Sequence, residues 1–78
     1  MDSKEIVKQA LEFVTGRIFT EEELGSEQTL EGLDVDSLEL LELDLIIEEQ
    51  SGVRLPDDSI KTVKSVGQLI ELVEANRT

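Results

Sequence analysis

The sequence predicts a small all-α fold, a four-helix bundle in which a short third helix accompanies three main helices. Two observations favour this class: apolar residues recur at helical spacing in three segments, and a capping residue precedes each segment. The chain has 78 residues, of which 38% are hydrophobic. A chain this short buries only about 60% of its unfolded surface. We therefore expect one domain over residues 1–78, without a deep active-site cleft.

The first main helix is predicted within residues 2–16. Asp2 or Ser3 suits its N-cap, and Gly16 suits a left-handed stop. The face turned to the core is expected to consist of Ile6, Val7, Ala10, Leu11 and Val14. The two aromatic residues of the chain, Phe13 and Phe19, are expected to help fill the core.

A long connection is predicted between this helix and the next, over residues 17–34. Thr20 and Glu23 have the spacing of a capping box, which predicts one short helical turn. We expect the connection to be pinned to the core by the apolar residues Ile18, Phe19, Leu24, Leu30 and Leu33.

The second main helix is predicted to begin at Ser37 and to end near Ser51, before Gly52. Asp36 is a good N-cap, and the side chain of Glu39 can reach back to the backbone N–H of the cap.

An extended piece over residues 53–55 follows, and Pro56 is expected to open a brief helical turn over 57–62. The last helix is predicted after Ser65, with Gln68 completing another capping box. Its apolar face comprises Val66, Leu69, Ile70 and Val73.

The second helix carries apolar residues on two sides. One stripe suits the core and consists of Leu40, Leu43 and Ile47, with Ile46 at its edge. The opposite stripe consists of Leu38, Leu41 and Leu45, with Glu42 and Glu49 beside it. This second stripe is either another buried seam or an exposed partner-binding face.

The charge balance limits the possible partners. Nineteen acids against seven bases give a net charge of −12, and there is no histidine. Nucleic acid and anionic membranes attract bases, so neither is an expected partner. Acidity of this size either keeps the protein soluble or steers it to basic patches on other proteins.

Several chemistries are missing from the sequence. Without cysteine there is no disulfide, no thiol nucleophile and no Cys zinc site, and without histidine Ser37 cannot belong to a Ser-His-Asp triad. An EF-hand reading of "DVDSLE" fails because Glu39 and Leu45 stand where glycine and a bidentate glutamate are required. We expect neither a metal site nor an enzyme. No signal peptide or membrane span is recognisable, so cytoplasmic residence is expected.

Ser37 is placed where a helix begins, beside the second stripe. Backbone N–H groups lack partners there, and the helix dipole favours a phosphate ester on the hydroxyl. Serines are also common at helix starts for purely structural reasons.

The stretch "DVDSLELLEL" resembles the modification motif of acyl carrier proteins, in which Asp-Ser-Leu opens the second helix. The resemblance continues through "EEQSGVRLPDDSIKTVKSVGQLIELV" and covers about residues 4–74. It implies that a separate phosphopantetheinyl transferase moves 4′-phosphopantetheine from coenzyme A to Ser37, with Asp36 and Leu38 flanking the site. The chain would then be a monomeric, stand-alone carrier of acyl thioesters for fatty acid or related biosynthesis. Its partner enzymes, which have basic patches, would contact Leu38, Leu41, Glu42, Leu45, Glu48 and Glu49.

Three residues depart from the fatty-acid carriers of that family. Asp34 stands where glycine is usual, Asp44 where an aliphatic packs, and Ser51 where phenylalanine is expected. These departures favour a specialised carrier. The alternatives are a polyketide, aminoacyl or D-alanyl carrier, or an acidic adaptor that is never modified.

Overall fold

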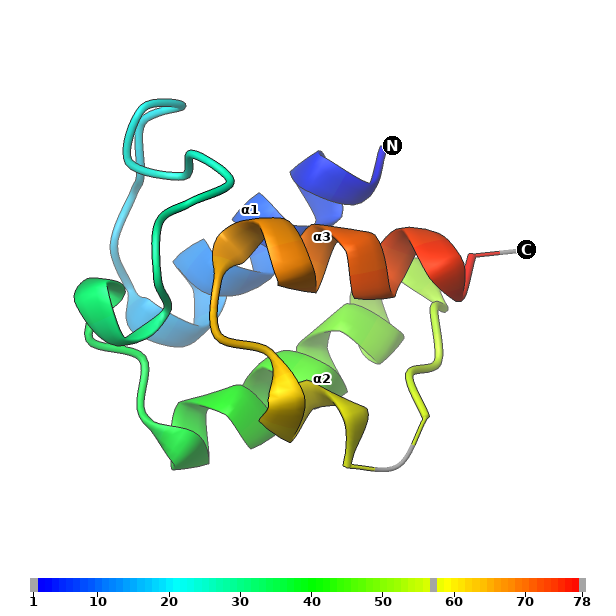
Figure 1. The fold of residues 1–78 in the computed structure, drawn as a ribbon. Helices are drawn as coiled ribbons and strands as arrows, with labels where there is room; N and C mark the ends of the chain where they lie inside the picture. Colours follow the sequence, from blue (N-terminus) through cyan, green and yellow to red (C-terminus); the bar gives the residue numbers. More distant parts are fainter. Residues whose placement is uncertain (1, 57, 78) are drawn as a thin grey trace.

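The computed structural model describes residues 2–56 and 58–77. Its elements, in chain order, are α1 (Ser3–Thr15), η1 (Glu31–Leu33), α2 (Ser37–Ser51), η2 (Ser59–Thr62) and α3 (Val66–Ala75) (Figure 1). Within the described ranges the only β pairing is an isolated antiparallel bridge between Thr29 and Ser65. The predicted all-α bundle is confirmed, and its short third helix is a 3-10 helix.

The caps that the sequence predicts fix the ends of α1. The side chain of Asp2 accepts a hydrogen bond from the backbone N–H of Glu5 at 2.8 Å, so Asp2 is the N-cap. Gly16 adopts the left-handed conformation, with φ at 71°, and its N–H bonds to the carbonyl of Glu12 at 2.9 Å. The left-handed backbone ends α1, and glycine suits this position because a side chain there would be strained.

The core lies between the three α-helices and the segments that connect them. α1 packs against both α2 and α3, and α2 packs against η2. Of the five residues expected to anchor the connection, four are buried: Phe19, Leu24, Leu30 and Leu33. The other members of the core are Ile6, Val7, Ala10, Leu11, Val35, Leu43, Ile47, Val53, Leu55, Ile60, Val63, Val66, Leu69 and Val73.

Two expectations about the core were wrong. The side chain of Ile18 is 89% exposed, because it lies between Arg17, which reaches the carbonyl of Leu33, and Phe19, which points inward. Phe13 is 64% exposed, because it lies to the side of the stripe of α1 that enters the core. Only one of the two aromatic rings therefore fills the core.

The connection between α1 and α2 is fastened to the start of α3. The N–H of Leu30 donates to the carbonyl of Lys64 at 2.9 Å, and the N–H of Val66 donates to Gln28 at 2.8 Å. The N–H of Gly67 donates to the carbonyl of Ser26 at 3.0 Å. In Figure 1 this connection lies at one end of the bundle, so α1 and α2 run in opposite directions.

The segment after α2 differs in detail from the prediction. Val53 and Leu55 are buried and Arg54 is exposed, as expected for a non-helical piece that packs on the core. The helical turn begins at Ser59, and Asp58 precedes it in a left-handed conformation with φ at 62°. Position 57 lies outside the described residues. Within the described ranges, no helix combines the length and apolar character required to cross a membrane.

Candidate functional site

Ser37 is the first residue of α2, and a complete capping box holds it there. The side chain of Asp36 accepts the N–H of Glu39 at 2.8 Å, and the side chain of Glu39 accepts the N–H of Asp36 at 3.3 Å. The backbone of Asp36 is extended, with φ at −89° and ψ at −179°. The two acids predicted to start the helix therefore fix its first turn.

The hydroxyl of Ser37 is exposed, and no hydrogen bond among the described residues engages it. The first backbone bond of the helix runs from the N–H of Leu40 to the carbonyl of Asp36 at 3.0 Å. The N–H groups of Ser37 and Leu38 therefore precede the intrahelical ladder, where the helix carries partial positive charge. A phosphate ester on Ser37 fits this environment.

The turn before α2 orients this helix start. Asp34 follows η1 in a left-handed conformation, with φ at 61°, and its N–H bonds to the carbonyl of Glu31 at 2.9 Å. The N–H of Val35 donates to the carbonyl of Leu30 at 3.0 Å, and the Val35 side chain is buried. The left-handed backbone explains why glycine is usual at this position in the family that the sequence resembles.

A cleft of about 300 Å³ lies near the start of α2, although Ser37 itself does not line it. Val35 and Leu40, which flank the serine within three residues, contribute to its wall. The remaining lining residues are Thr29, Leu30, Glu31, Val63 and Lys64. The cleft therefore offers apolar surface and one cation near the start of α2. The cleft is not predictable from the sequence, because its far wall comes from residues distant in the chain.

The two stripes of α2 lie on opposite sides of the helix. Leu43 and Ile47 are fully buried, and Leu40 and Ile46 are partly buried against the core. The outer stripe, defined as Leu38, Leu41 and Leu45, is exposed, at 65%, 45% and 64% respectively. Of the two readings left open by the sequence, the buried seam is wrong. The helix presents a free apolar stripe.

Acids line this outer stripe on both sides. Helical periodicity places Glu48 beside Leu41, and Glu42 and Glu49 on the other border, and all three acids are exposed. Glu48 approaches Arg54 at 3.9 Å, and both side chains of this pair are well exposed. Such a surface pair contributes little to stability. The described part of the chain holds no group of three acids arranged to bind a metal ion.

Comparison with known proteins identifies the family that the chain matches. The model of the family described as "Phosphopantetheine attachment site" matches residues 5–73. The fold and this match define the chain as a phosphopantetheine-attachment domain.

Named relatives agree with this class. An acyl carrier protein of Wolinella succinogenes is 29% identical over 76 residues, covering 97% of this chain and 93% of that protein. One of Rubrobacter xylanophilus is 31% identical over 80 aligned positions, covering all of this chain and 99% of that protein. One of Acidothermus cellulolyticus is 48% identical over 46 residues, which cover 59% of this chain and only 54% of that protein.

The chain therefore belongs to the acyl carrier protein family. It is a carrier and not an enzyme, and its cofactor is covalently bound 4′-phosphopantetheine.

Proposed function

We propose that Ser37 is the attachment residue and that the chain carries acyl groups as thioesters on the pantetheine thiol. The observation that supports this most directly is the exposed, unengaged hydroxyl at the first position of α2. The chain lacks cysteine, so the thiol has to come from the cofactor. Stand-alone operation is part of this proposal, and it is supported by relatives named acyl carrier protein of which the chain covers 93% and 99%. Cytoplasmic residence stays a prediction.

Loading requires a second protein. The Oγ–P bond forms as the pyrophosphate linkage of coenzyme A breaks, and adenosine 3′,5′-bisphosphate leaves. The chain has no histidine to accept the hydroxyl proton, so the transferase must supply the base. Asp36 and Leu38 flank the reacting oxygen and give the transferase one acid and one apolar side chain to recognise.

The cleft near the start of α2 suits the near part of the cofactor. Val35, Leu40 and Val63 offer apolar surface for its gem-dimethyl group. Lys64 is at the rim, and none of the ion pairs among the described residues uses its side chain. Its charge suits the phosphodiester that would replace the hydroxyl proton.

The outer stripe suits transient docking of partner enzymes. Leu38, Leu41 and Leu45 supply a small apolar contact. Glu42, Glu48 and Glu49 attract bases and speed the encounter more than they tighten the complex. A carrier that hands cargo from one enzyme to the next benefits from a small interface that dissociates readily.

The pathway is proposed as fatty acid or related acyl-chain biosynthesis, by a specialised carrier. The departures at Asp34, Asp44 and Ser51 support specialisation. Ser51 lines a cleft of about 440 Å³ at the end of α2, where the family's phenylalanine would add apolar volume. Polyketide, aminoacyl and D-alanyl carriers share the serine, and the acyl group found on protein purified from its native cell separates these alternatives.

Intact mass spectrometry tests the proposal. Incubation with coenzyme A and a promiscuous phosphopantetheinyl transferase should add the mass of one phosphopantetheinyl group. Ser37→Ala should stay unmodified, whereas Ser65→Ala, which removes the N-cap hydroxyl of α3, should still be loaded. An unchanged mass of the wild-type chain would instead favour the unmodified adaptor.

A further inference from the structure

Phe13 is an exposed aromatic residue on α1 that no part of the proposed site uses. Its side chain is 64% exposed, although the chain has only two aromatic rings and a small core to fill. Aromatic side chains are enriched among the residues that dominate protein–protein binding. A ring left on the surface of so acidic a domain therefore points to contact with another protein.

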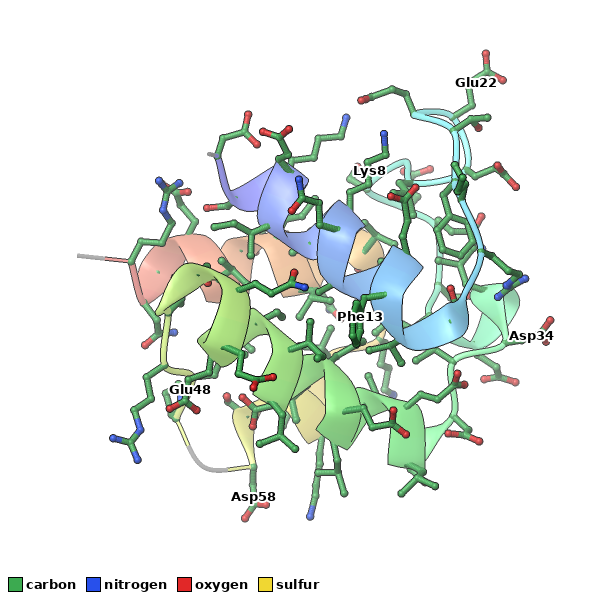
Figure 2. All side chains as sticks on the ribbon, turned by 180° about the vertical axis from the view of Figure 1, so that it is seen from behind. Lys8, Phe13, Glu22, Asp34, Glu48 and Asp58 are labelled. Atoms are coloured by element: carbon green, nitrogen blue, oxygen red, sulfur yellow. The ribbon has the colours of Figure 1, made fainter. Side chains whose placement is uncertain are left out.

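The structure places Phe13 on the flank of α1 that faces α2. Ile6, two helical turns before Phe13, lines the same cleft as Gln50 of α2. Figure 2 shows Phe13 on the α1 side turned toward α2. On α2 this flank continues one turn from Gln50 to Ile46, which is partly buried. Beyond Ile46 lie first Glu42 and Glu49 and then the outer stripe, so Phe13 adds a second apolar part on the α1 side of these acids.

The outer stripe alone offers less area than a standard interface. A helix of 15 residues offers a strip of roughly 22 Å by 10 Å. That is about a quarter of the roughly 800 Å² that each partner contributes to a standard interface. An enzyme seated on the outer stripe alone would bury less than a standard interface, and a neighbouring element would add to that small area. On the α1 side, Phe13 is the exposed apolar residue within reach.

The charges around this surface define the partner. α2 contains no lysine or arginine, and Glu42 and Glu49 lie one turn on either side of Ile46. The bases of α1 lie elsewhere: Lys4 pairs with Glu21 at 2.7 Å, and Lys8 is on the side of α1 away from α2 (Figure 2). The surface from Phe13 to Leu45 therefore consists of two apolar parts, with Glu42 and Glu49 between them and no base of α1 or α2 on it.

We propose that Phe13 and the outer stripe form one docking surface, and that its occupant is the phosphopantetheinyl transferase, through an apolar recess surrounded by lysine and arginine. This rests on the proposed modification of Ser37. Phe13 acts as an anchor on α1, while Glu42 and Glu49 between the two apolar parts meet the partner's bases. The transferase thereby recognises two helices and not only the motif around the serine.

Loading kinetics test this proposal on the full chain, with coenzyme A and a purified promiscuous transferase. Phe13→Ala should lower kcat/KM about tenfold, mainly through KM, as expected for a lost anchor. Phe13→Leu should recover most of the loss. Ile18→Ala, which removes an even more exposed apolar side chain in the connection, is the matched control and should load like wild type. All variants should melt within about 2 °C of wild type, because these side chains pack little in the monomer.

Salt separates the two parts of the surface. Glu42→Gln should weaken the dependence of KM on NaCl, whereas Phe13→Ala should leave that dependence unchanged. Equal rates for Phe13→Ala and wild type would overturn the docking surface, as would an equal loss in Ile18→Ala. A dimer that Phe13→Ala abolishes would show that a second copy covers this face and would also overturn it. A wild-type chain that is never loaded would overturn the proposed function itself.

Discussion

The hydroxyl of Ser3 donates a hydrogen bond to the carboxylate of Glu74 and so joins the start of α1 to the end of α3. Ser3 is the one buried polar residue among those described, and Arg77 donates to its oxygen at 3.1 Å. Arg77 also lies 3.3 Å from the carboxylate of Glu74. Figure 1 shows the two ends of the chain on the same side of the bundle.

This contact makes the pKa of Glu74 a reporter of how the termini pair. The hydrogen bond from Ser3 lowers the pKa of Glu74 below 4.5, and the charge of Arg77 adds to the effect. Its folded-state pKa is the lower one, so its contribution to stability is present above about pH 4.5 and is lost as pH falls through the folded pKa. Ser3→Ala should raise the pKa of Glu74, measured by NMR titration of its carboxyl carbon. An unchanged pKa of Glu74 in Ser3→Ala would show that this hydrogen bond does not form in solution.

The left-handed backbone of Asp34 predicts that glycine at this position would stabilise the protein. A left-handed backbone costs a non-glycine residue on the order of 1 kcal/mol, and glycine would remove that strain while loosening the unfolded chain. Asp34→Gly should therefore gain a few tenths of a kcal/mol in urea unfolding. Asp34→Ala removes the same charge but keeps the strain, so it should be about 1 kcal/mol less stable than Asp34→Gly. Equal stabilities of the two variants would show that the left-handed φ at this position does not lower the stability of the protein.

Gly67 is required by a close approach between α3 and the connection. A Cβ built there would lie 2.7 Å from the carbonyl oxygen of Ser26, a backbone atom that cannot rotate away. Gly67→Ala should therefore lose about 1–3 kcal/mol, despite the better helix propensity of alanine. Gly32→Ala is the control, because its Cβ would meet side-chain atoms and no backbone: Gln28 Nε2 at 2.6 Å and Thr29 Oγ1 at 2.9 Å. Its smaller loss should be visible in the same thermal melts.

Leu43 and Leu45 separate the two sides of α2 by a stability measurement. Leu43 is fully buried, so Leu43→Ala should cost about 2–5 kcal/mol in chemical unfolding. Leu45 is 64% exposed, so Leu45→Ala should change stability by at most about 0.5 kcal/mol. Similar losses in the two variants would mean that the outer stripe is packed in solution. The stripe would then be closed to partners.

The helices were predictable because each signal is local. The capping boxes of Thr20 and Ser65 form as their spacing predicts, and so does the box of Asp36 with Glu39. The split of α2 into two stripes also follows from helical periodicity alone. Helical periodicity does not show which of the two stripes faces solvent, because that depends on which elements pack beside the helix.

Ile18 and Phe13 show where residue type misleads. Both are large and apolar, and both were expected in or near the core. Phe13 lies at the edge of the stripe formed by Ile6, Ala10 and Val14, two turns after the buried Ile6, so helical periodicity alone does not predict its exposure. Ile18 gives no signal either, because its orientation depends on the packing of its neighbour Phe19. The cleft near the start of α2 was equally hidden, since Val63 and Lys64 reach it only through the fold.

Three backbone hydrogen bonds join residues 26–30 to the start of α3, so the local opening of these two distant segments is coupled. The amide protons of Leu30, Val66 and Gly67 are locked by the same junction, so they should exchange with deuterium at one common rate. The amides of Ser37 and Leu38, outside that lock, should exchange far sooner. The start of α2 can thus fluctuate while the scaffold behind it stays assembled.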